Sequence, residues 1–124
     1  MRERNRSVIR NALASVAVSD ISRAAQWYER LFGRPADSTP TKELAEWKFE
    51  GGGWLQVYEG ADRAGGGSFT LSVSDLAGEM SRLQNAGFNT GKTIETATVR
   101  VMMLEDPDGN SIAFAEAGDP GMAR

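Results

Sequence analysis

The chain has 124 residues, 40% of them hydrophobic, and its 14 Lys and Arg against 17 Asp and Glu give a formal net charge of -3. This size predicts a single domain, 1–124, and the mixed charge offers no basic face to nucleic acid. The chain has no Cys and no His, which excludes disulfides, thiol nucleophiles and imidazole as a base or metal ligand. No apolar run could span a bilayer or serve as a secretion signal, so we expect a cytoplasmic protein without a membrane partner.

The first half begins with a predicted strand at 13–18, followed by a helix that runs to about Phe32. Asp20 supplies the N-cap oxygen of this helix, and Gly33 fits its C-terminal stop. The apolar residues of the helix fall on one face, which predicts packing on a sheet. Tyr28 lies on that face and is therefore interpreted as a core residue rather than a catalytic one.

After this helix, 35–41 is predicted to be a turn-rich loop. Strands at 45–50 and 54–59 form a hairpin across the three glycines 51–53. The glycine-rich loop 61–67 lacks the lysine and the following helix of a phosphate-binding loop, so we interpret it as a flexible connection.

The second half repeats this order, with a strand at 68–73 and a helix at 75–86. The sequence TGKT at 90–93 is like the end of a Walker A loop, but it follows a helix where that motif needs a strand. A nucleotide site is therefore rejected. Strands at 98–104 and 111–115 form the last hairpin.

Two segments of the chain repeat one another. The sequence VSDI at 18–21 recurs as VSDL at 73–76, and each copy ends a strand, caps a helix and precedes a hairpin. This repeat predicts two similar modules, about 12–60 and about 67–116. The segments expected to be solvated termini are 1–10 and 118–124.

Residues 106–110 read DPDGN, which is concentrated turn chemistry before an alternating strand. With VAVSD at 16–20 and Trp27-Tyr28, this corner resembles the vicinal-oxygen-chelate superfamily, which includes glyoxalases, bleomycin-resistance proteins and extradiol dioxygenases. The resemblance covers roughly 12–116. It implies an α+β fold in which two βαβββ modules form a curved mixed sheet around a concave cavity, with the helices outside. It also implies a homodimer, which the three Trp support because Trp is enriched at interfaces.

The resemblance places the family's four metal-ligand positions at Leu13, Gln56, Ser68 and Ala113. Leu13 and Ala113 have no side-chain ligand atom, and the amide and hydroxyl of the other two are weak neutral ligands. We therefore expect no metal ion and no other cofactor. The metal-dependent isomerase, dioxygenase and epimerase activities of the family are not expected either.

Alternation along the strands predicts which side chains face the cavity. Leu55, Val57 and Phe114 are expected to pack against the helices. The residues that alternate with them are expected to face the cavity. Arg100 would offer an anionic ligand a fixed positive charge if it points inward, and a solvent-exposed strand edge is the alternative. The residues expected to bind a ligand are Trp54, Gln56, Tyr58, Ser68, Thr70, Arg100, Met102 and Ala113.

These features predict a metal-free protein of the bleomycin-resistance type that binds or sequesters a small molecule, either aromatic or anionic. One alternative is a metal-independent enzyme of the same fold, acting as a lyase, isomerase or oxygenase on a small organic substrate. No pair of carboxylates and no nucleophile with its base identifies catalytic residues for it. The other alternative is a dimeric interaction module without a ligand.

Overall fold

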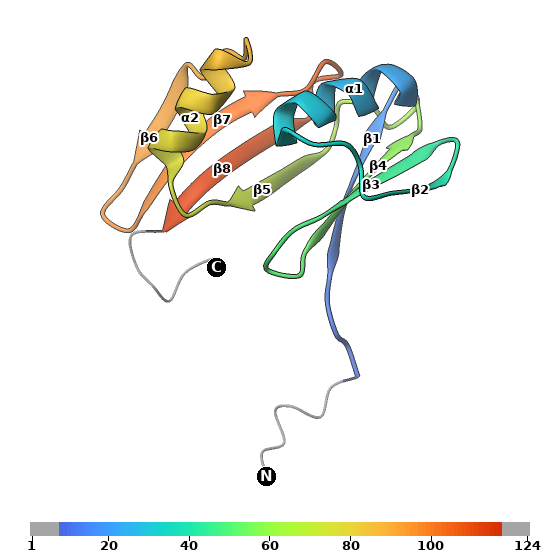
Figure 1. Cartoon of the computed structure of the whole chain (residues 1–124), viewed down its shortest axis with the longest axis horizontal. Helices are drawn as coiled ribbons and strands as arrows, with labels where there is room; N and C mark the ends of the chain where they lie inside the picture. Colours follow the sequence, from blue (N-terminus) through green and yellow to red (C-terminus); the bar gives the residue numbers. More distant parts are fainter. Residues whose placement is uncertain (1–7, 118–124) are drawn as a thin grey trace.

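The structure, a computed structural model, describes residues 8–117 and confirms the α+β class with two βαβββ modules (Figure 1). The first module consists of β1 Leu13–Val18, α1 Ile21–Phe32, β2 Ser38–Thr41, β3 Leu44–Lys48 and β4 Trp54–Glu59. The second consists of β5 Ser68–Ser72, α2 Leu76–Asn85, β6 Lys92–Glu95, β7 Val99–Glu105 and β8 Ser111–Ala117. The predicted solvated termini lie outside the described residues, apart from 8–10. No helix within 8–117 is long and apolar enough to cross a membrane.

The strands form two separate four-stranded sheets, in the orders β1-β4-β3-β2 and β5-β8-β7-β6. The pairs β1–β4 and β5–β8 are parallel, and the other pairs are antiparallel. β1 and β5 are thus edge strands at corresponding positions of the two modules. In Figure 1 both helices lie along the top of the view, and the two sheets diverge below them.

The strands β2 and β6 correct the sequence analysis, which interpreted 35–41 as a loop and identified no strand at 92–95. Each has four residues, lies at the outer edge of its sheet and is mostly exposed, so neither carries a clear apolar alternation. Pro40 within β2 is tolerated because an edge strand does not need every backbone N–H for its ladder.

The helix ends follow the predicted caps. Asp20 Oδ1 accepts hydrogen bonds from the backbone N–H groups of Ser22 and Arg23 at 3.0 and 3.3 Å. Gly33 ends α1 with φ 74°, a left-handed conformation that favours glycine. The first N–H group of α2, on Leu76, donates to the Glu116 carboxylate of β8 at 2.6 Å, which ties the start of this helix to its sheet.

One core serves both modules. Tyr28, Trp47 and Leu55 from the first module lie in the same buried cluster as Met102 and Phe114 from the second. The prediction that Leu55, Val57 and Phe114 cover the helices is confirmed, because their exposed fractions are 1%, 0% and 2%. The helix-covered faces of both sheets therefore point into a common interior.

The corner at 106–110 joins the two modules. Asn110 is completely buried, and its Nδ2 donates to the carbonyl oxygen of Ala17 at 2.9 Å and to Asp106 Oδ2 at 2.8 Å. Its Oδ1 accepts from the N–H group of Gly67 at 2.8 Å. These bonds hold the end of β1 next to the start of β5.

Candidate functional site

The first sheet presents an open face on the side away from α1. Leu55 and Val57 are buried beneath the helix, so the alternating residues Trp54, Gln56 and Tyr58 lie on the opposite face and are partly buried. This is the arrangement that strand alternation predicts for these three residues. The structure therefore brings Trp54, Gln56 and Tyr58 together in one row.

A chain of hydrogen bonds crosses three strands of this open face. Ser15 on β1 donates its hydroxyl hydrogen to Gln56 Oε1 at 2.9 Å, and Gln56 Nε2 donates to Glu46 Oε2 on β3 at 2.6 Å. Glu46 is only 8% exposed although no helix covers it. Beside this chain, Lys48 Nζ lies 4.5 Å from the centroid of the Trp54 ring, a cation–π contact that orients the indole.

Glu46 is not among the residues that the sequence predicts to bind a ligand. A signal for it was present, because Glu46 alternates with the apolar Trp47 and must share a face with Lys48. Strand pairing supplies what alternation alone lacks, since it sets Glu46 directly opposite Gln56. A carboxylate thus completes the polar row that Gln56 begins.

The open face of the second sheet carries mostly small side chains. Ser68 and Thr70 of β5 are exposed, and Ala113 of β8 lies opposite Thr70. Met103 of β7 lies on the other side of Ala113. Small side chains leave the backbone of this sheet accessible to a partner or ligand.

The structure does not gather all the predicted ligand residues in one cavity. Gln56 and Tyr58 belong to the first sheet, whereas Ser68 and Ala113 belong to the second. The covered faces of both sheets meet in one core, so the two open faces lie on the outer sides of that core. A site that joined Gln56 and Tyr58 to Ser68 and Ala113 would need a second copy of the chain.

Two predicted ligand residues lie on the wrong face of β7. Met102 is opposite Phe114 and completely buried in the core, so it cannot contact a ligand on the open face. Arg100 shares that face, opposite Glu116, and its Nε lies 3.8 Å from Glu95 Oε2. Alternation correctly groups Arg100 with Met102, but only strand pairing decides which side of the sheet the pair occupies.

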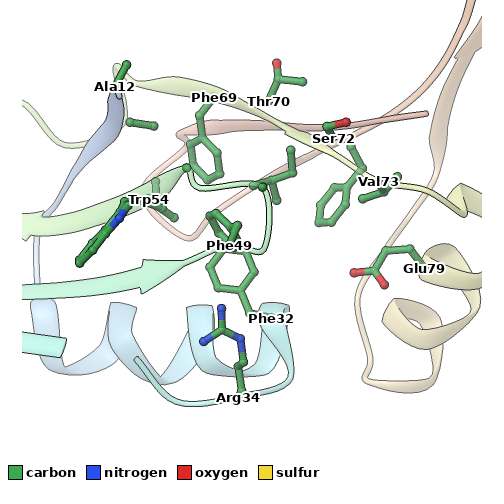
Figure 2. A pocket seen from close by; sticks show the side chains of 16 residues that line it. Ala12, Phe32, Arg34, Phe49, Trp54, Phe69, Thr70, Ser72, Val73 and Glu79 are labelled. Carbon is green, nitrogen blue, oxygen red and sulfur yellow. The ribbon is translucent and has the colours of Figure 1, made fainter. Parts of the chain in front are cut away.

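A separate cleft of about 480 Å³ lies between the two sheets, and Figure 2 shows its lining. Its wall is mainly apolar and comes from both modules, including Phe32 of α1, Phe49 before the hairpin turn and Phe69 of β5. Of the predicted ligand residues, Trp54 and Thr70 border it. The sequence gives no signal for this cleft, because it depends on how the two modules sit against each other.

Tyr28 is excluded as an acid or base near neutral pH. Burial, followed by the negative charge of Asp106 and the hydrogen bond to it, raises the pKa of the Tyr28 phenol far above its ordinary value. Tyr28 is therefore a permanent hydrogen-bond donor inside the core, as expected for a residue with a structural role.

The family-type metal positions do not fit a metal ion. Gln56 has its oxygen engaged with Ser15 and its nitrogen with Glu46, and Leu13 and Ala113 have no ligand atoms. Within 8–117, no group of three or more Asp and Glu side chains is arranged to hold a metal. A catalytic divalent ion would need a ligand set of that kind.

The family model described as Glyoxalase/Bleomycin resistance protein/Dioxygenase superfamily matches residues 11–114. A glyoxalase/bleomycin resistance protein from Catenulispora acidiphila is 36% identical, with 86% of this chain and 96% of that chain covered and a TM-score of 0.79. TnmS3, an antibiotic binding protein from Streptomyces sp. CB03234, is 24% identical over 90% of this chain and 98% of its own, with a TM-score of 0.76.

A bleomycin resistance determinant encoded on the transposon Tn5 is 17% identical, with 90% of this chain and 100% of that chain covered and a TM-score of 0.69. At the identities of the Tn5 determinant and of TnmS3, the likeness shows the fold alone. No curated protein matches the chain.

Proposed function

Because the chain belongs to the Glyoxalase/Bleomycin resistance protein/Dioxygenase superfamily, we propose that it binds or sequesters a small molecule without using a metal ion. Structurally similar proteins include an antibiotic binding protein and a bleomycin resistance determinant. The vacant metal-ligand positions favour this role over the metal-dependent reactions of the superfamily.

The observation that carries the proposal is the polar row between two aromatic side chains on the open face of the first sheet. Gln56 and Glu46 form its centre, and Trp54 and Tyr58 flank Gln56 along β4. Aromatic rings offer contact area at low entropic cost, and a few fixed polar groups orient a ligand. A row built only for packing would not need a hydrogen-bonded amide and carboxylate.

In this proposal an aromatic or partly apolar ligand stacks on Trp54 or Tyr58 and bonds to Gln56. Ser68, Thr70 and Ala113 supply a second, smaller wall from the other sheet. The cleft within one chain is not lined by Gln56, Ser68 or Ala113, so that wall comes from a partner. We therefore also propose a cytoplasmic homodimer, in which each site combines the first sheet of one copy with the second sheet of the other.

Exposed apolar side chains support the dimer. Ile94 of β6 and Leu13 of β1 are 56% and 48% exposed, and both lie on the open faces of their sheets. β1 and β5 are also the outermost strands on one side of their sheets, and edge strands are common sites of contact with another chain.

The function is tested by mapping ligand-induced NMR shifts of the wild-type protein with a panel of small aromatic compounds, neutral and anionic. We expect saturable shifts centred on Trp54, Gln56 and Tyr58, and about tenfold weaker binding for Gln56→Ala. The matched control is Gln26→Ala, which changes an exposed glutamine on α1. A panel without any binder would favour an interaction module, and turnover of a compound in the presence of chelator would favour an enzyme.

A further inference from the structure

The cleft between the two sheets is a second space with its own chemistry. It is bordered by β1 and β5, the edge strands of the two sheets. Its walls are mainly side chains on the helix-covered faces, such as Leu55 and Phe114. Trp54 of the open face borders it, whereas Gln56 and Tyr58 do not line it. We propose that this cleft binds a neutral aromatic small molecule without using Gln56 or Tyr58.

Aromatic rings form most of the wall. Phe32 and Phe49 meet edge to face with ring centroids 5.4 Å apart, and the Phe69 ring stands on the β5 side (Figure 2). All three are only partly buried, although they pack on the core. Partly exposed apolar side chains gathered around one hollow mark a binding site more often than scattered ones do.

The charged residues of the cleft are already neutralised. Arg34 pairs with Asp37 at 2.6 Å and also donates to the carbonyl oxygen of Lys48. Its hydrogen bond lowers the pKa of the Asp37 carboxyl, which keeps the pair charged. Glu79 accepts two hydrogen bonds from Arg82, at 2.5 and 3.1 Å. Among the described residues that line the cleft, Arg34 and Glu79 carry the charges and both are paired, so the occupant is neutral.

The size of the cleft sets the scale of the occupant. A volume of about 480 Å³ lies within the usual range for small-molecule sites and suits two or three fused or linked rings. Thr70 borders the cleft, but Figure 2 shows its hydroxyl pointing away from the phenylalanine rings. The ligand is therefore mainly apolar.

The test uses N-phenyl-1-naphthylamine, a neutral aromatic dye, with the full chain. We expect saturable binding in the cleft with fluorescence enhancement, and this binding should be weakened about tenfold by Ala12→Phe. Ala12 is exposed at the mouth of the cleft, so a larger side chain there blocks entry without entering the core. The matched control is Ala97→Phe, which adds the same ring at an exposed turn outside the cleft and should bind the dye normally.

Two further measurements separate this cleft from the open face. NMR shifts caused by the dye should centre on Phe49, Phe69 and Leu71, and these shifts should persist in Gln56→Ala. The anion 8-anilino-1-naphthalenesulfonate should bind about tenfold more weakly than the neutral dye. Three results would overturn the proposal. The first is an equal loss of dye affinity in Ala12→Phe and Ala97→Phe, and the second is dye-induced shifts centred on Gln56 and Tyr58. The third is dye binding only when the protein is diluted to monomers. The last result would mean that a second copy covers the cleft.

Discussion

Tyr28 and Asp106 join the two modules through a buried hydrogen bond, in which the phenol donates to the carboxylate Oδ2 at 2.8 Å. Tyr28 belongs to α1, and Asp106 begins the corner that precedes β8. The same carboxylate also accepts from the backbone N–H groups of Asp108 and Asn110, so it fixes the corner as well as the helix. The packing of the modules therefore depends on one carboxylate and its donors.

Tyr28→Phe removes this donor and keeps the ring. We expect the free energy of unfolding to fall by about 1–3 kcal/mol, because a buried carboxylate loses one of its partners. Urea unfolding followed by circular dichroism measures it. Tyr58→Phe, on the open face, is the control and should change stability by less than about 0.5 kcal/mol. Similar losses in the two variants would refute a linking role for the Tyr28 hydroxyl.

Alkaline pH should destabilise the protein through Tyr28. The folded-state pKa of its phenol is raised above the ordinary value of 10.0, so the folded chain retains a proton that the unfolded chain releases. The stabilisation is full below about pH 10 and decreases as the pH rises further. Unfolding free energies at pH 9 and 11 test this, with Tyr28→Phe as the comparison. The variant should lose less stability between these two pH values than the wild type does.

Trp54→Ala should weaken an aromatic ligand by one to a few kcal/mol, about the value of a stacked ring and its buried area. The free energy of unfolding should fall by less than the free energy of ligand binding, because the ring lies at the border of the core rather than within it. Titration calorimetry measures the binding, and urea unfolding measures the stability. The matched control is Trp27→Ala, whose ring packs on Tyr28 and Phe88 with centroids 4.9 and 5.4 Å apart. Trp27→Ala should lose stability and keep ligand affinity. If Trp54→Ala also lost stability and kept ligand affinity, Trp54 would belong to the core.

Treatment with a chelator should leave the melting temperature unchanged. Leu13 and Ala113 offer no ligand atoms, and the Gln56 amide is engaged at both ends. Elemental analysis of purified protein should accordingly find no stoichiometric transition metal. About one tightly bound metal ion per chain would contradict this, since such affinity needs a real ligand set.

Sedimentation at micromolar concentration should give the mass of a homodimer. Apolar side chains such as Ile94 and Leu13 are exposed on the open faces of the two sheets, and association would cover them. Ile94→Lys is a useful companion variant, because a charge at this exposed apolar position should shift the equilibrium toward monomer. A wild-type monomer at all concentrations would contradict the prediction.

Local chemistry made most of the first module predictable from sequence. Asp20 and Gly33 mark the two ends of α1, and the alternation around Leu55 separates the covered from the open side of β4. β2 was not predicted from the sequence, because its four residues include Pro40 and are mostly exposed. An edge strand is stabilised by its neighbour rather than by its own pattern, so its sequence need not show one.

The site was less predictable than the fold, for two reasons. Because side chains alternate along a strand, the sequence shows that Arg100 and Met102 share a face. Which face they occupy depends on the pairing of β7 with β8. The inter-sheet cleft depends on packing between residues distant in the chain, such as Phe32 and Phe69, which no local pattern encodes. That Trp54 and Gln56 share a face could be predicted, because a single strand carries both.

The shared core has a consequence for the origin of the repeat. Each module has its own helix and four-stranded sheet, yet Tyr28 of one packs against Phe69 of the other, with ring centroids 6.4 Å apart. An ancestor of half this length would have left such rings in water unless two of its copies associated. Joining the two copies in one chain would make that association permanent and would allow the two halves to diverge. The Asp106 corner is an example of such divergence, because its bonds to Tyr28 and Asn110 require each of these residues in only one of the two modules.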